Sequence, residues 1–254
     1  MYDGNPQTKG DKMAIGNKQQ WQDAFEAYKA LIHDPRYDSE YLRRTGLVPH
    51  MIELIGDMRR LQVLDAGCGT GWLFDAITPL GGCECDVVPP VRRNNSRIRS
   101  HCQDVCRLTY DDDSFDLVVS SLVLMWVDDL YGAFREAYRV TRPGGRLIVS
   151  LMHPYFHTNG HVLHNGSFLI DQSVGSREER NVMISGIVGP LTYYSRPLVD
   201  YYNAALQARW RLVGFRDHFI DMERYRIETV DRVKFTHRTD KIPLFTFFVC
   251  GKDT

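Results

Sequence analysis

Three glycines at alternate positions, Gly67, Gly69 and Gly71, follow an apolar stretch that ends in the acidic residue Asp65. Glycine has no Cβ, so the backbone of such a turn can bend tightly and approach a ligand closely. The residues after Gly71 have a helical pattern, and the free N–H groups at the start of a helix point toward such a ligand. The stretch therefore predicts a ligand-binding loop between a buried strand and a helix.

The spacing of these glycines argues against a dinucleotide as the ligand. Dinucleotide-binding turns have the pattern Gly-x-Gly-x-x-Gly, in which the last glycine allows close packing of helix and strand. In this chain Trp72 occupies that last position. A bulky indole fits a pyrophosphate clamp poorly, so a nicotinamide-dependent oxidoreductase is disfavoured.

Two acidic residues close the next apolar stretch, which begins at Gly81. A carboxylate at the end of a second strand, about 20 residues after a glycine loop, accepts hydrogen bonds from ribose hydroxyls in nucleotide-binding folds. Asp86 fits this role best, and Glu84 is the alternative. Four arginines follow (Arg92, Arg93, Arg97 and Arg99), and we interpret them as a solvated surface rather than a phosphate-binding patch.

Two groups of residues, histidines and cysteines, have spacings that could suit a metal site. His153, His157, His161 and His164 are four and three residues apart, which would suit one face of a helix. Pro154 and two Asn-Gly pairs indicate a loop instead, and no acidic or cysteine cluster completes the ligands. The cysteine pairs 83/85 and 102/106 lack the usual Cys-x2-Cys spacing. We therefore expect no metal.

The elements that must position these residues follow from apolar periodicity. An α/β pattern is predicted, with strands alternating with helices from residue 61 onward. The expected strands span 61–65, 81–88, 115–122, 146–150, 210–221 and 242–250, and the expected helices span 21–32, 39–45, 49–58, 72–78, 128–140 and 198–208. Gly46 is expected to stop the second of these helices.

Four segments resemble, in order and spacing, the motifs of class I S-adenosylmethionine-dependent methyltransferases. Residues 64–71 are similar to motif I, 101–105 to the third motif, 114–121 to motif IV, and 139–150 to the Pro-Gly-Gly turn and its strand. The resemblance implies a Rossmann-like, seven-stranded, mostly parallel sheet with helices on both faces. It also implies S-adenosyl-L-methionine as cofactor and S-adenosyl-L-homocysteine as product.

The resemblance further implies roles for individual residues. Asp65 would help hold the methionine end of the cofactor, Asp86 the ribose and Asp104 the adenine amino group. The complete set expected to bind the cofactor is Asp65, Gly67, Cys68, Gly69, Asp86, Val87, Asp104, Val105, Ser120 and Leu122.

Aromatic residues crowd the expected acceptor side, where their faces would attract both a sulfonium and a planar acceptor. His153 directly follows a strand, where the resembled family places substrate-facing groups. Since imidazole titrates near neutrality, His153 is the candidate general base. The residues expected to bind the acceptor are Tyr28, Tyr37, Trp126, His153, Tyr155, Tyr194 and Arg196.

The reaction implied is in-line transfer of a methyl group to an O, N or C atom of a small molecule, because an aromatic lid suits a compact acceptor. An RNA or protein methyltransferase is one alternative, supported by the arginine cluster alone. The other is a non-catalytic S-adenosylmethionine-binding subunit, since Met125-Trp126 stands where many relatives carry histidine. The oligomeric state stays open.

Bulk properties agree with an ordinary globular enzyme. The 254 residues carry a formal net charge of −1, which gives no general attraction to nucleic acid or anionic membranes. Six cysteines without disulfide spacing favour a reducing cytoplasm. The expected divisions are a disordered tail (1–20), an N-terminal helical lid (21–60), a cofactor-binding core (61–152), a substrate-lid insertion (153–197) and a C-terminal completion of the sheet (198–254).

Overall fold

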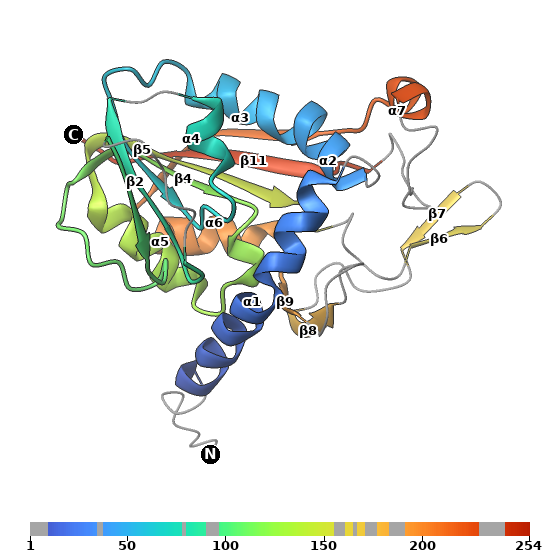
Figure 1. Ribbon diagram of the computed structural model, residues 1–254, viewed down its shortest axis with the longest axis horizontal. Helices are drawn as coiled ribbons and strands as arrows, with labels where there is room; N and C mark the ends of the chain where they lie inside the picture. Colours follow the sequence, from blue (N-terminus) through green and yellow to red (C-terminus); the bar gives the residue numbers. More distant parts are fainter. Residues whose placement is uncertain are drawn as a thin grey trace.

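The computed structural model describes residues 10–34, 38–77, 80–89, 97–154, 161–164, 167–170, 177–182, 191–228 and 242–254. Within them, one sheet has the strand order β10-β11-β5-β4-β1-β2-β3 (Figure 1). Its strands are β1 (Gln62–Ala66), β2 (Gly81–Asp86), β3 (Ile98–Cys102), β4 (Phe115–Ser121), β5 (Thr141–Met152), β10 (Arg211–His218) and β11 (Phe245–Gly251). Strand β11 is antiparallel to both of its neighbours, and the other pairs are parallel. The predicted seven-stranded, mostly parallel sheet is confirmed.

The central strands are apolar along their length because helices cover both faces of the sheet. Helices α5 (Leu130–Val140) and α6 (Leu198–Gln207) pack on one face, and α3 (Val48–Ile55) and α4 (Trp72–Ala76) pack on the other (Figure 1). Alternate residues of β4 serve the two cores, with Val118 in one and Leu117 and Val119 in the other. Helix α5 is capped by Asp129, whose Oδ1 accepts a hydrogen bond from Gly132 N at 2.8 Å. The helix predicted over 128–140 therefore begins two residues later than expected.

The order of the strands fixes where a ligand can bind. From β1 the chain continues outward to β2 and β3, and then returns to place β4 on the other side of β1. The loops that follow β1 and β4 diverge at this switch point and leave a crevice at the carboxyl ends of the strands. The glycine loop after β1 therefore lies at the position where α/β folds bind nucleotides.

The N-terminal segment differs from the sequence expectation. Helix α1 spans Gly10–His33, so residues 10–20 are helical rather than part of a disordered tail. Polar contacts explain the difference, because Gln20 Oε1 accepts hydrogen bonds from both Thr192 N and Thr192 Oγ1 at 2.9 Å. An apolar-periodicity argument does not register such contacts. Residues 1–9 lie outside the described residues, and α1 ends one residue after the predicted end at residue 32.

A continuous helical run follows, made of α2 (Asp38–Leu42), a turn of π-helix called η2 (Arg43–Leu47), and α3. The prediction that Gly46 ends a helix is wrong, since Gly46 lies inside the π-turn. A Cβ at this position would lie 2.6 Å from Nε2 of His218 on β10. Gly46 therefore permits close packing of the turn against the sheet.

The segment 153–197 was predicted to be a loop, and this is also corrected. Strands β6 (His161–His164) and β7 (Ser167–Ile170) form one antiparallel pair, and β8 (Glu178–Val182) and β9 (Leu191–Ser195) form another. Strand β9 is buried, and its Leu191 packs against Ala24 of α1. Because such short strands gain their stability from packing against other elements, local composition did not reveal them. The last described helix is α7 (Met222–Glu228). Among the helices of the described residues, none has the length and apolar character needed to cross a membrane.

Candidate functional site

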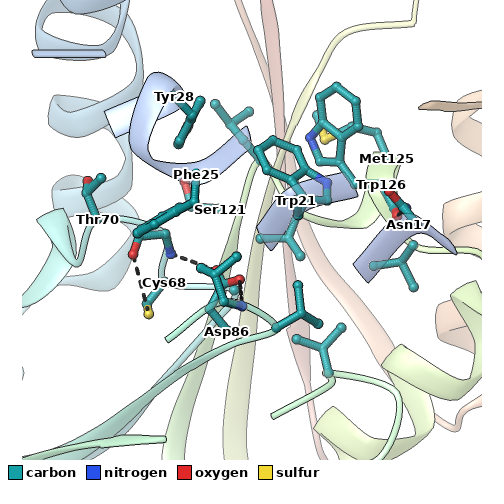
Figure 2. Close-up of a pocket in the computed structure, with 18 of the residues that line it drawn as sticks. Asn17, Trp21, Phe25, Tyr28, Cys68, Thr70, Asp86, Ser121, Met125 and Trp126 are labelled. Carbon is teal, nitrogen blue, oxygen red and sulfur yellow. Dashed lines mark hydrogen bonds between the residues drawn. The ribbon is translucent and has the colours of Figure 1, made fainter. Parts of the chain in front are cut away.

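A cavity of about 890 Å³ lies at the carboxyl ends of the sheet strands and beneath α1. Its wall is built from the loops that follow β1, β2, β3 and β4, from one face of α1, and from the start of η2 (Figure 2). This volume is within the range of small-molecule and cofactor sites. The cavity therefore has room for a nucleoside cofactor together with a compact second ligand.

The glycine loop adopts the backbone conformation that its sequence predicts. The φ angles of Gly67, Gly69 and Gly71 are +82°, +53° and +78°, a region that L-residues with a Cβ rarely occupy. A Cβ on Gly67 would also overlap the side chain of Val123. The amides of Gly67 and Cys68 donate to Cys85 O at 2.8 and 3.0 Å. These bonds fasten the loop to the end of β2.

Asp86 is the acidic residue that β2 presents to the cavity (Figure 2). Its Oδ2 accepts a hydrogen bond from Gly69 N at 2.8 Å and its Oδ1 accepts one from Val88 N at 3.2 Å. Burial raises the pKa of the Asp86 carboxyl, while these backbone hydrogen bonds oppose the rise. Glu84 is fully buried beneath, where it accepts a hydrogen bond from Ser100 Oγ at 2.6 Å. The geometry brings Asp86, and not Glu84, to the cavity.

The structure brings together most of the residues expected to bind the cofactor. The wall contains Gly67, Cys68, Gly69, Asp86, Val87, Asp104, Val105 and Leu122. Asp65 and Ser120 are only 1% and 4% exposed and lie behind the wall. Successive strand residues point to opposite faces, so Ser121, rather than Ser120, reaches the cavity.

An aromatic wall faces the glycine loop across the cavity. Trp21, Phe25 and Tyr28 recur at helical spacing on one side of α1, and Trp126 joins them from the short 3-10 helix η3 (Leu124–Trp126) (Figure 2). The rings of Trp21 and Trp126 meet edge to face with centroids 5.0 Å apart. Trp21 and Phe25 were assigned to a helix but not to the site, because periodicity does not reveal which neighbour a helix covers.

Hydrogen bonds hold α1 to both sides of the cavity. Asn17 Nδ2 donates to Trp126 O, and Gln22 Nε2 donates to Val87 O at 3.1 Å. Burial raises the pKa of Tyr28, so its phenol is neutral near pH 7. Helix α1 thus covers the cavity with a largely apolar surface, to which Lys18 adds one charged side chain.

Arg196 and Tyr194 lie outside the cavity wall and support it from behind. The Arg196 guanidinium donates to the carbonyl oxygens of Val127 and Asp128, both at 2.7 Å. It also lies over the Tyr194 ring, 4.8 Å from the centroid. These contacts fix the loop that carries Trp126, so both side chains position the aromatic wall.

His153 is placed away from the cavity. Its side chain is 3% exposed, and its Nε2 lies 3.9 Å from Oδ1 of Asp217 on β10. Burial lowers the pKa of the imidazole. The candidate general base is therefore not among the groups that line the cavity. Tyr37 and Tyr155, two expected acceptor ligands, and His157 lie outside the described residues, and no metal-binding cluster occurs among those that are described.

Comparison with known proteins identifies the central part of the chain. Residues 64–149 match the family model described as a methyltransferase domain. A malonyl-[acyl-carrier protein] O-methyltransferase of Halorhodospira halophila is 34% identical over 132 residues, which are 47% of this chain and 45% of that protein. The chain thus spans less than half the length of the curated relatives it matches.

Solved structures share the fold over most of the chain. An S-adenosylmethionine-dependent methyltransferase from Mesorhizobium loti superposes with a TM-score of 0.63 at 20% identity, covering 80% of this chain and 96% of the other. The 1,6-didemethyltoxoflavin-N1-methyltransferase of Burkholderia thailandensis, with bound 1,6-didemethyltoxoflavin and S-adenosylhomocysteine, has a TM-score of 0.58 at 14% identity. It covers 99% of this chain and 93% of its own. At these identities the likeness establishes the fold.

Proposed function

We propose, from the premise that this chain contains a class I S-adenosylmethionine-dependent methyltransferase domain, that the protein transfers a methyl group to a compact acceptor. The main observation in support is that one cavity is lined by the glycine loop and Asp86 on one side and by the aromatic wall of α1 and η3 on the other. One end of this cavity has groups that would hold a nucleoside. The other end is apolar and suits a small, flat molecule.

The residues present fit the cofactor. The Asp86 carboxylate would accept hydrogen bonds from the ribose hydroxyls, and Asp104 would accept one from the adenine amino group. The positive φ values of the glycine loop leave its backbone bare where the cofactor would approach. When bound, S-adenosylmethionine supplies a methyl group that is already activated by the positive charge on sulfur.

The protein's own contribution is then binding, alignment and exclusion of water. The aromatic rings of Trp21, Tyr28 and Trp126 would flank both the positive sulfur and the acceptor. Because His153 lies behind the wall, no imidazole of the described residues is placed to accept a proton from the acceptor. The arrangement suits an acceptor atom that is already a nucleophile at neutral pH, such as a carboxylate or an amine of low pKa.

We also propose that α1 is a lid and that the segment 153–197 supports it through β9. In support of this, Gln20 of α1 binds Thr192 of β9, and η3 packs between them through the Trp126–Tyr193 contact, with centroids 5.4 Å apart. A covered cavity favours a small molecule or a flexible arm over a folded polymer. The named activity of the Halorhodospira relative, on a malonyl group held by a carrier protein, is compatible with either.

A screen of candidate acceptors with a radiolabelled methyl donor tests the proposed activity. We expect label to move to one or more small carboxylates or amines of low pKa, and the Asp86→Ala variant to lose this transfer. Transfer only to RNA or to protein chains would contradict the small-molecule part of the proposal. Cofactor binding without any transfer would favour the alternative of a non-catalytic binding subunit.

A further inference from the structure

Arg43 is a charged side chain in an otherwise apolar part of the cavity wall. It stands at the first position of η2 and lines the cavity next to Leu42 and Leu47. Its Nε is buried, and no group in the described part of the chain accepts a hydrogen bond from it. A guanidinium is always charged, and a buried N–H without an acceptor is costly to leave in that state.

The neighbouring arginine shows what an ordinary surface arginine does in the same turn. Arg44 is exposed, and its Nε donates to Glu40 Oε1 at 3.1 Å across one helical turn. The Nε of Arg43 has no such partner within the described ranges, although Arg43 lies only one residue away. The difference indicates that the Arg43 side chain is kept for a group that enters the cavity.

The π-turn that carries Arg43 is held in place by contacts of its later residues. Thr45 Oγ1 donates to Tyr41 O at 2.8 Å, and Gly46 packs directly against His218 and Phe245. These contacts anchor the turn against α2 and against strands β10 and β11, and Phe245 itself also lines the cavity. An extra residue in a helical turn shifts the side chains that follow it, and such turns are frequent at functional sites.

The positive charge of Arg43 acts on other groups that line the cavity. Tyr28 lines the cavity from α1, and its phenol experiences the positive charge of Arg43 as well as the negative charge of Asp86. A second buried donor, the Thr70 hydroxyl, also lines the cavity and has no partner among the described residues. Two donors that line one cavity and have no partner among the described residues suit an anionic group with several acceptor oxygens.

We propose that Arg43 binds a carboxylate that enters this cavity. A carboxylate is planar, and its two oxygens match the fork of N–H donors on a guanidinium. Given the proposed function, on which this inference rests, two carboxylates have access. One is the methionine carboxylate of the cofactor, and the other is a carboxylate on the methyl acceptor.

The first arm of the test uses two ligands that differ only in the carboxylate. Calorimetry compares S-adenosylmethionine with its decarboxylated form on the wild type, Arg43→Gln, Arg43→Lys and Arg44→Gln. If the cofactor supplies the carboxylate, Arg43→Gln weakens the binding of S-adenosylmethionine by about tenfold to a hundredfold. The binding of the decarboxylated form is then unchanged. Arg43→Lys, which keeps the charge, falls between, and Arg44→Gln matches the wild type.

The second arm covers the acceptor. Aromatic acids and their matched amides, such as phenylacetate and phenylacetamide, are titrated into the S-adenosylhomocysteine complexes of the same variants. If the acceptor supplies the carboxylate, the wild type binds the acid at least tenfold more tightly than the amide. Arg43→Gln then loses that preference. The inference is overturned if Arg43→Gln equals the wild type in both arms, or if it weakens the acid and neutral ligands equally. If the wild type binds no S-adenosylhomocysteine, the proposed function itself is contradicted.

Discussion

Asp86 links the glycine loop to the cavity. Its carboxylate accepts hydrogen bonds from Gly69 and Val88 and still faces the cavity. Glu84, two residues earlier on the same side of β2, is buried and bonded to Ser100. The two acids therefore have separable roles, one toward a ligand and the other toward the core.

Asp86→Ala is expected to weaken S-adenosylmethionine binding by about 1.5–3 kcal/mol, the value for hydrogen bonds to a charged group. Glu84→Gln keeps an acceptor for Ser100 and serves as the control, with near-normal binding. Isothermal titration calorimetry measures both. A larger effect at Glu84 than at Asp86 would mean that the ligand contacts a different part of β2.

Gly67→Ala tests the bare backbone of the loop. The new Cβ has to occupy a positive φ and overlap Val123, so we expect a loss of stability of about 1–3 kcal/mol together with weaker cofactor binding. Gly69→Ala has a positive φ but no neighbour within 4 Å, and is expected to cost less stability. Thermal melts of the two variants give the comparison. Equal melting temperatures would show that overlap with Val123 adds nothing to the stability lost at Gly67.

At the scale of elements, the lid proposal concerns α1. The sequence predicted a disordered tail over residues 1–20, but Asn17 and Gln20 hold the helix to η3 and β9. Gln20→Ala should loosen the attachment of α1 to β9. It should lower the rate of methyl transfer more than it lowers the affinity for the cofactor. Gln19→Ala is the matched control, since Gln19 bonds only Asp23 on the exposed side of the helix.

Hydrogen exchange with and without S-adenosylhomocysteine reports this directly. We expect the ligand to increase protection of residues 21–32 and of β9, and Gln20→Ala to reduce that increase. Equal protection in the two states would mean that α1 is a fixed part of the scaffold.

Much of the fold was predictable because parallel strands and glycine turns leave local signals. Continuous apolar runs marked β1 and β4, and the glycine spacing marked the loop. The parts that were missed depend on contacts between distant segments. Gly46 resembled a helix stop but serves packing against His218, and His153 followed a strand but turned toward Asp217. Arg43 had no sequence signal at all, since only the fold shows that it lines a cavity.

A cluster of histidines away from the cavity makes the stability of the whole molecule depend on pH. His218 packs against His50, with ring centroids 4.6 Å apart, and Asp217 lies beside it in sequence and near His153. Burial and the nearby His50 lower the pKa of His218 to about 4. Between about pH 6.5 and pH 4 the unfolded chain therefore binds a proton that the folded chain does not.

The free energy of unfolding should consequently fall as the pH is lowered through this window. Chemical denaturation at pH 7, 6 and 5 measures the slope, and His218→Gln should make it shallower, since glutamine does not titrate. A slope that is unchanged in His218→Gln would assign the pH dependence to other groups, such as His153.

The central claim at the scale of the whole molecule is that the cavity under α1 is built for S-adenosylmethionine and not for a dinucleotide. Calorimetric titration of the full chain with S-adenosylhomocysteine and, separately, with NAD tests it most directly. We predict saturable one-to-one binding of S-adenosylhomocysteine, weakened in Asp86→Ala, and no measurable heat of binding with NAD. Binding of NAD in preference to S-adenosylhomocysteine, or binding of neither, would contradict the account.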